Sequence, residues 1–127
     1  VDLRSALAAA FDPGPAVEQD ELVVVQHTWA EIRTFMWNYV GIVRTSRRLK
    51  RARHRINLVR EELHAYYWDY RVDADLLELR NLADVAHLVI EAALRRRESR
   101  GLHTTLDWEE TNPKWVRDTL LERRLWL

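Results

Sequence analysis

The sequence predicts an all-α protein, an antiparallel three-helix bundle. Composition is the first indication: the 127 residues include only three glycines and three prolines, too few for the many turns of an all-β fold. Leucine, alanine, arginine and glutamate are abundant and favour helix. Three segments also carry apolar residues at steps of three and four, the spacing of one helix face. This length predicts one domain with one modest core.

Residues 1–27 are predicted to be a linker or strap outside the bundle. At most one short helix is expected, near residues 5–10, because Asp12-Pro13-Gly14-Pro15 interrupts regular structure. The apolar run Leu22–Val25 fits a short strand or an extended strap, and its length does not decide between them. Because the chain begins at Val1 rather than methionine, we expect a fragment of a longer polypeptide.

The first bundle helix is predicted to begin at Thr28. Thr28-Trp29-Ala30-Glu31 has the capping-box pattern, in which the threonine hydroxyl and the glutamate satisfy each other's backbone amides. The stripe that follows is broad and predicts burial against more than one neighbour; it comprises Trp29, Ile32, Phe35, Met36, Tyr39, Val40 and Val43. Gly41 falls within this stripe, where glycine costs up to about 1 kcal/mol relative to alanine. We therefore expect a close helix crossing at Gly41.

The second helix follows a break at Arg44-Thr45-Ser46. It has strict three-four spacing, typical of a bundle seam, through Leu49, Ala52, Ile56, Val59, Leu63 and Tyr66. The aromatic cluster Tyr66–Tyr70 is predicted to close one end of the core.

The third helix is predicted to begin at Asp73 or Asp75, since either carboxylate can cap a helix. Its buried face comprises Leu76, Leu79, Ala83, Ala86, Ile90 and Ala93. Arginines 95–97 are expected in its last turns, where positive charge complements the helix dipole, and Gly101 is expected to end it. The bundle would then span residues 28–101 in the up-down-up order of a spectrin repeat.

Residues 102–127 are predicted to form an extended tail outside the bundle. Leu102–Trp108 is expected to hold a short extended piece, Asn112-Pro113 a turn, and Lys114–Leu127 at most one further helix. Six tryptophans are many for this chain. Those outside the three stripes need cover from another domain or a partner.

Charge and composition restrict the function classes. Cysteine is absent, which excludes disulfides and thiolate chemistry. We expect a cytoplasmic protein, since the sequence has neither an apolar run near the ~20 residues of a membrane helix nor the layout of a secretion signal. Net charge is zero, yet residues 44–71 hold nine Arg or Lys against three acids. This basic segment fits a solvated helix surface better than a nucleic-acid interface, because the sequence shows no helix-turn-helix or aromatic-interleaved module.

Motifs for catalysis and for metal binding are weak. The sequence has no glycine-rich loop between a strand and a helix that would cradle a dinucleotide. Ser99, His103 and Asp107 recur at four-residue spacing, but a helix that stops at Gly101 cannot present them on one face, which disfavours a hydrolase. His87 and Glu91 lie one helical turn apart without a third ligand. We assign no catalytic, cofactor-binding or metal-binding residue to this chain.

The most informative segment runs from Arg95 to His103, with four arginines, a glycine and a histidine in nine positions. In a loop, guanidinium and imidazole groups can be held rigidly against acceptors on a neighbouring surface. We therefore predict an interdomain docking loop, whose candidate residues are Arg97, Glu98, Arg100, Gly101 and His103.

Three runs of sequence together resemble one known family. They are Met-Trp-Asn-Tyr-Val-Gly-Ile-Val-Arg at residues 36–44, Tyr-Tyr-Trp-Asp-Tyr at 66–70, and Glu-Ser-Arg-Gly-Leu-His at 98–103 followed by Leu106-Asp107. From about His27 to Trp108 the chain resembles the C-terminal helical domain of the L-aspartate oxidases, in the succinate dehydrogenase and fumarate reductase flavoprotein family. Thr104-Thr105 and the tail after Trp108 depart from the family's usual form.

The resemblance implies a parent enzyme that uses FAD to oxidise L-aspartate to iminoaspartate. Electrons would pass to oxygen or fumarate, on the route through quinolinate to NAD, with quinolinate synthase downstream. The family's dinucleotide-binding glycines and dicarboxylate-gripping residues belong to upstream flavin-binding and capping domains and have no match here. The resemblance therefore implies a structural domain, inactive alone, that docks on the flavin-binding domain. The alternative is a free-standing helical interaction module that binds an acidic protein or nucleic acid through its basic second helix.

Overall fold

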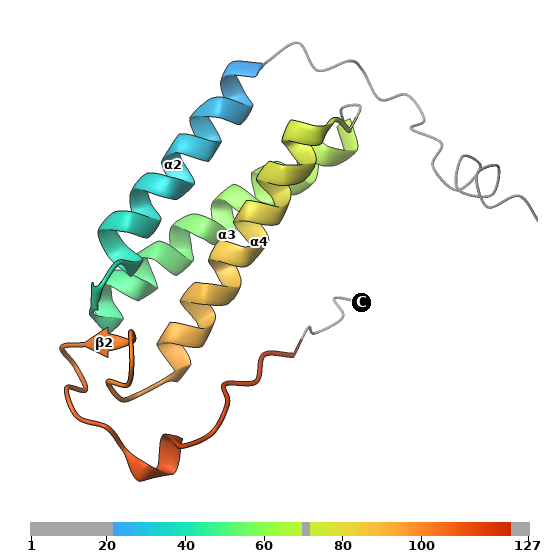
Figure 1. The fold of residues 1–127 in the computed structure, drawn as a ribbon. Helices are drawn as coiled ribbons and strands as arrows, with labels where there is room; N and C mark the ends of the chain where they lie inside the picture. The colour runs from blue at the N-terminus through green and yellow to red at the C-terminus, as the bar shows by residue number, and fades with distance from the viewer. Residues whose placement is uncertain (1–21, 70–71, 123–127) are drawn as a thin grey trace, which may run out of the picture.

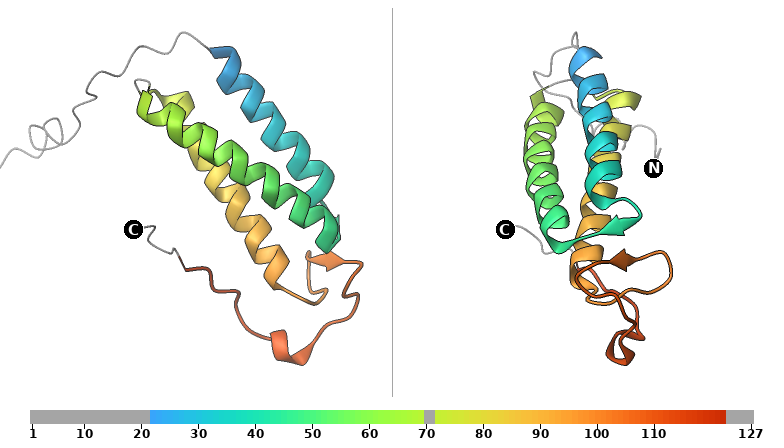
Figure 2. Two further views of the ribbon diagram at one scale, coloured as in Figure 1. Left: turned by 180° about the vertical axis from the view of Figure 1, so that it is seen from behind. Right: turned by 90° about the vertical axis from the view of Figure 1, so that its left-hand side faces the viewer.

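The structure, a computed structural model, describes residues 22–69 and 72–122 (Figure 1). Within these residues three α-helices lie side by side: α2 (Leu22–Val40), α3 (Ser46–Asp69) and α4 (Ala74–Arg95). α3 runs antiparallel to α2 and α4, so the predicted up-down-up bundle is confirmed (Figures 1 and 2). The short helix predicted near residues 5–10 lies outside the described residues.

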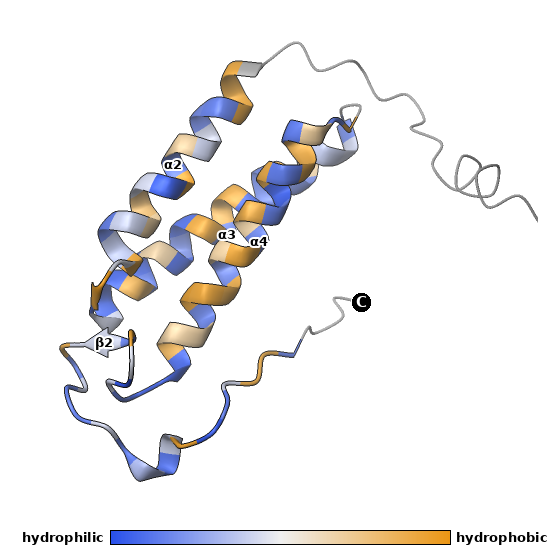
Figure 3. Ribbon diagram, viewed as in Figure 1, coloured by the Kyte–Doolittle hydropathy of each residue, from blue (hydrophilic) through white to orange (hydrophobic). Residues whose placement is uncertain are grey.

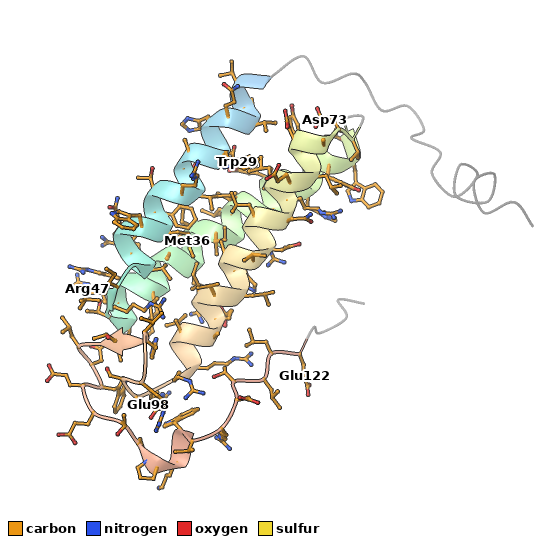
Figure 4. All side chains as sticks on the ribbon, viewed as in Figure 1. Trp29, Met36, Arg47, Asp73, Glu98 and Glu122 are labelled. Atoms are coloured by element: carbon orange, nitrogen blue, oxygen red, sulfur yellow. The ribbon has the colours of Figure 1, made fainter. Side chains whose placement is uncertain are left out.

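One apolar core lies between the three helices. Trp29 and Met36 project from α2 toward the other two helices and pack against the edge of this core (Figure 4). The stripes predicted for α3 and α4 are confirmed. The buried side chains are Val25, Ile32, Phe35 and Val40 of α2; Leu49, Ala52, Ile56, Val59 and Leu63 of α3; and Leu76, Leu79, Ala83, Ala86, Ile90 and Ala93 of α4.

The aromatic residues at the end of α3 divide between the core and the surface. Tyr66 and Tyr67 pack against the core, whereas Trp68 is exposed. Tyr67 and Trp68 meet edge to face with ring centroids 5.5 Å apart, an arrangement that aromatic pairs prefer.

The first helix begins earlier than the sequence predicted. α2 starts at Leu22, so the strap prediction for residues 22–27 and the helix start at Thr28 are wrong. The Thr28 hydroxyl is not a cap; it donates to the carbonyl of Val24, one turn back, at 2.8 Å. Val25 explains the difference, because it is only 3% exposed and continues the stripe of Trp29 and Ile32 by one more turn. Burial in the tertiary structure outweighs the local capping signal.

α2 ends at Val40, just before the glycine that the stripe seemed to include. A Cβ atom at Gly41 would lie 2.5 Å from the carbonyl oxygen of Trp37. The glycine is therefore required by the backbone of the last turn of α2, which precedes it. The expected close crossing with another helix is wrong, because only atoms of Trp37 lie within 4 Å of that Cβ position. Val43 leaves the helical stripe and is half exposed.

Replacing Gly41 by alanine is expected to destabilise the fold by about 1–3 kcal/mol, because the turn must distort to relieve the contact with Trp37. Thermal or urea unfolding measures the change. Asn38→Ala, on the exposed last turn of the same helix, is the control and should change stability by less than about 0.5 kcal/mol. Equal stability of the two variants would contradict the steric role of the glycine in this turn.

α3 and α4 are both capped by side chains. The Asp73 carboxylate accepts from the Leu76 amide at 2.7 Å, which confirms one of the two predicted caps. At the start of α3, the Asp107 carboxylate accepts from the Ser46 amide at 2.5 Å. This second cap comes from far along the chain and joins the tail to the bundle.

α4 ends at Arg95, and the residues that follow are extended. Arg96 has φ −86° and ψ 103°, so arginines 96 and 97 do not lie in the last helical turn as predicted. Gly101 does not end the helix either. It has φ +60° and occupies a tight turn further on, a conformation that favours glycine.

The segment after α4 folds back on the end of α2. Strand β2 (Thr104–Thr105) pairs in parallel with β1 (Val43–Arg44), and Val43 lies opposite Thr104. Asn112 then caps the 3₁₀ turn η1 (Pro113–Trp115). The extended piece predicted within Leu102–Trp108 is confirmed. For the tail from Lys114 at most one further helix was predicted; as far as residue 122 the structure has only the 3₁₀ turn η1 there. Among the described helices, none is both long and apolar enough to cross a membrane.

Candidate interdomain docking site

The loop after α4 is built around a buried carboxylate. Glu98 is fully buried and lies between α4 and η1 (Figure 4). One carboxylate oxygen accepts from Arg96 at 2.6 Å and from Arg100 at 2.9 Å; the other accepts from Arg100 at 3.0 Å and from the Asn112 amide at 2.8 Å. Four charge-assisted or backbone hydrogen bonds satisfy the carboxylate and make its burial tolerable.

These partners keep Glu98 ionised. The hydrogen bonds from Arg100, the Asn112 amide and Arg96 outweigh the effect of burial and lower the pKa of Glu98 from 4.5 to about 2. The carboxylate is therefore charged at every physiological pH. It acts as the fixed anion around which the loop is organised.

Arg96 fastens the tail to the same centre. Besides Glu98, its guanidinium donates to the carbonyls of Trp115 at 2.9 Å and Arg117 at 2.5 Å, and to the Thr119 hydroxyl at 3.3 Å. The rigid, multidentate geometry of arginine suits such a hub. The tail is thus held along the end of α4 rather than left free.

His103 connects the loop to the end of α2. Its Nδ1 lies 2.9 Å from Nη1 of Arg44, and its Nε2 lies 3.1 Å from the carbonyl oxygen of Arg96. Arginine only donates, so Nδ1 must accept and the proton must sit on Nε2. Burial lowers the pKa of His103, and the nearby Arg44 and Arg96 charges act in the same direction. The imidazole is neutral at pH 7.

Acidification is expected to loosen this connection. The pKa of His103 is lower in the folded protein than its ordinary 6.5, so the stability it contributes is complete above that value and is lost as pH falls through the lower, folded value. Protonation removes the acceptor for Arg44. The thermal midpoint should therefore fall between about pH 7 and pH 5, and this slope should be smaller in His103→Asn.

His54→Gln is the control for the acidification experiment, because His54 is exposed on α3. It should keep the wild-type slope. The ring nitrogen shifts of His103 in an NMR titration report the tautomer directly, and a proton on Nδ1 at pH 7 would contradict the arrangement.

The residues of the disfavoured hydrolase motif do not meet. The Ser99 hydroxyl donates to the Trp108 carbonyl at 2.7 Å and accepts from the Thr105 amide at 3.0 Å. Asp107 caps α3, and His103 bonds Arg44 and Arg96. Each side chain holds a different part of the loop in place.

His87 and Glu91 also lack the surroundings of a metal site. Within the described residues, no group of three or more metal-ligating side chains comes together. The Glu91 carboxylate lies 3.9 Å from Nε of Arg53. Burial, together with the charge of Arg60, lowers the pKa of His87. Both residues belong to the α3–α4 interface.

Four basic side chains in the middle of α3 are paired within the bundle: Arg51, Arg53, Arg55 and Arg60. Arg60 contacts Asp84 at 2.9 Å, and Arg55 contacts Glu31. Arg51 lies over the ring of Tyr39, 5.9 Å from its centroid. These contacts cross from α3 to both neighbouring helices, which favours a solvated, self-complementary face over a phosphate-binding one.

The candidate docking residues differ in what they expose. Glu98 is buried, Arg100 is turned onto it, and His103 is engaged with Arg44. Arg97 and Gly101 are exposed. Of the charged candidate residues, Arg97 faces outward without a partner that the structure shows, whereas Glu98, Arg100 and His103 are engaged within the loop or with Arg44.

Sequence reasoning missed the hub role of Arg96 and the contribution of Arg44. A signal for Arg96 was present, because Arg96, Glu98 and Arg100 alternate and so share one side of an extended segment. It was obscured by assigning Arg96 to the helix. For Arg44 there was no local signal, since its partner lies 59 residues away.

Comparison with known proteins identifies the class. Residues 29–125 match the family model described as the fumarate reductase flavoprotein C-term. The chain belongs to this family of C-terminal flavoprotein domains. The match continues well past Trp108, so the tail that departs from the expected form is nevertheless part of the family's domain.

Bacterial and plant L-aspartate oxidases are similar to this chain. L-aspartate oxidase 1 of Ralstonia nicotianae is 56% identical over 105 residues, which cover 83% of this chain and 20% of that protein. L-aspartate oxidase of Pseudomonas aeruginosa is 52% identical over 112 residues, which cover 88% and 21%. The chloroplastic L-aspartate oxidase 2-a of Nicotiana tabacum is 43% identical over 83 residues, which cover 61% and 13%. The chain thus spans about a fifth of the length of the two bacterial relatives.

Proposed function

We propose that this chain is the C-terminal helical domain of an FAD-dependent L-aspartate oxidase. The observation that carries the proposal is an identity of 52–56% over more than 100 residues with two bacterial proteins of that name. The parent enzyme would oxidise L-aspartate to iminoaspartate in the cytoplasm, and quinolinate synthase would use the product. Flavin-binding and capping domains of the same polypeptide would carry the chemistry.

Within the described residues, the chain does not fit FAD. The one place where a strand leads into a helix is the turn from β1 to α3, and it holds no glycine. A dinucleotide phosphate would need the free amides at the start of such a helix. At α3 the Asp107 carboxylate already accepts from the Ser46 amide. We therefore assign the chain a structural role, without a catalytic or flavin-binding residue of its own.

The alternative, an interaction module for nucleic acid or an acidic protein, has less support. It depends on the basic face of α3, where Arg55 and Arg60 are committed to Glu31 and Asp84 on the neighbouring helices. A phosphate backbone would have to compete with these intramolecular carboxylates.

The proposal is tested with the full-length polypeptide that contains this chain. Purified with its flavin under anaerobic conditions, it should lose the oxidised flavin absorbance when L-aspartate is added. Succinate, which lacks the amino group, is the matched control and should reduce the flavin far more slowly. Reduction by succinate but not by L-aspartate would place the parent in another branch of the family and would overturn the proposal.

A further inference from the structure

Five large apolar side chains are exposed at the end of the bundle where β1 and β2 pair. We call them the end patch: Leu102 is 95% exposed, Trp37 and Ile42 77%, Leu106 56% and Val43 45%. They come from two parts of the sequence some 60 residues apart, and Figure 3 shows hydrophobic colour on the ribbon that leads into β1. A group of exposed apolar side chains of this kind marks an interaction surface.

The parallel strand pair gathers the end patch. Val43 lies opposite Thr104, and the Leu106 amide donates to the Arg44 carbonyl at 3.0 Å. Paired strands lie about 5 Å apart and rise about 3.3 Å per residue, so the backbone of residues 42–43 lies close to that of residues 102–106 at this end of the bundle. Trp37 stands on the last turn of α2, immediately before this area.

The end patch is held in place by polar contacts behind it. Leu102 sits at the tip of a two-residue turn, in which Arg100 and His103 exchange backbone hydrogen bonds of 2.9 and 3.1 Å. Gly101, with φ +60°, makes the turn possible. The flanking side chains are fixed in turn, Arg100 on Glu98 and His103 on Arg44. A nearly fully exposed leucine on so rigid a support is preorganised for binding.

We propose that the end patch is the surface through which this domain packs against the flavin-binding part of its own polypeptide. This inference rests on the proposed function. The occupant is argued from length, because the chain accounts for only about a fifth of its bacterial relatives and the remaining four fifths must meet it somewhere. Arg47 and Arg48 are exposed at the start of α3 and make no ion pair within the described residues; Figure 4 shows Arg47 next to β1. The partner surface is therefore apolar with an acidic rim.

Cysteine protection in the full-length polypeptide tests the end patch. This chain has no cysteine, so Leu102→Cys introduces one reporter here, read by mass spectrometry of its own peptide. The matched controls are Val23→Cys, 77% exposed near the other end of α2 and roughly 20 Å from Trp37, and Leu88→Cys, 50% exposed on α4. A maleimide should label position 102 at least roughly tenfold more slowly than position 23, because thiol reactivity follows exposure.

A charged substitution tests the same surface by function. Leu102→Asp cannot disturb a packed core, because the side chain is exposed, and it should release flavin faster and lower the thermal midpoint of the full-length enzyme. Val23→Asp should do neither. Fast labelling at 102 together with protection at 88 would move the interface to α4 and overturn the inference. The inference would also be overturned if position 102 lost its protection on dilution while the sedimentation coefficient changed. That result would mean that a second copy of the polypeptide covers the end patch.

The two proposals fail separately. If L-aspartate reduces the flavin in the wild type and position 102 labels as fast as position 23, the function stands and the end patch is wrong. If position 102 is protected but L-aspartate does not reduce the flavin, the docking surface stands and the substrate is wrong.

Discussion

Replacing Glu98 by glutamine is expected to release the segment from Arg96 to the end of the described tail. An amide has one acceptor oxygen, so its NH₂ group must face either Arg96 and Arg100, or Arg100 and the Asn112 amide, all of which are themselves donors. The guanidinium groups of Arg96 and Arg100, which are 18% and 38% exposed, would also lose their buried counter-charge, which is destabilising. We expect the thermal midpoint to fall by on the order of 10 °C. Limited proteolysis should cut first between residues 97 and 122.

Glu109→Gln is the control for the Glu98 variant, because this carboxylate is exposed in the same loop. It should change the midpoint by no more than about 2 °C. The two variants should also differ in acid. Since the pKa of Glu98 is about 2 in the folded protein against 4.5 ordinarily, its contribution is complete above about pH 4.5 and is lost as pH falls toward 2. An acid profile unchanged by Glu98→Gln would contradict the role of the buried carboxylate.

Replacing Ile56 by alanine is expected to cost about 2–5 kcal/mol of unfolding free energy. Ile56 is fully buried on α3, the helix that contacts both α2 and α4. Removing three carbon atoms there loses their transfer free energy and leaves a cavity that two neighbouring helices cannot close at once. Urea unfolding followed by circular dichroism measures the loss.

Leu58→Ala, on the same helix, is the control for the core variant. Leu58 is 37% exposed, so the substitution should cost no more than about 1 kcal/mol. The contrast isolates burial from helix propensity, since both positions lie in the interior of α3. Similar losses for the two variants would mean that the packing between the helices is not as the structure has it.

The helical stripes of α3 and α4 could be predicted from the sequence because burial in a bundle repeats with the helix period. Leu49 to Leu63 and Leu76 to Ala93 recur at steps of three and four, and all their predicted core positions are buried. The cap at Asp73 is equally local, since its partner amide lies three residues on. The start of α2 was predicted wrongly because it depends on burial that is not local. A locally convincing cap at Thr28 competed with the burial of Val25, which only the other helices supply.

The loop around Glu98 could be singled out from its composition but not described. Its residue types indicated a rigid polar site. The alternation of Arg96, Glu98 and Arg100 indicated that these three side chains share one side of an extended segment. The direction of the charges could not be predicted, and they were expected to face a neighbouring domain. In the structure Arg96 and Arg100 face Glu98, and His103 faces Arg44, whereas Arg97 and Leu102 are exposed.

The sequence by itself determined the all-α class, the order of the helices and their buried faces, because helix period and capping act over a few residues. Tertiary structure alone decided that Arg44 meets His103, that Asp107 caps α3, and that Val43 pairs with Thr104. Each of these contacts joins residues about 60 positions apart. Such pairings depend on how the loop folds back on the end of α2, and no local pattern records that path.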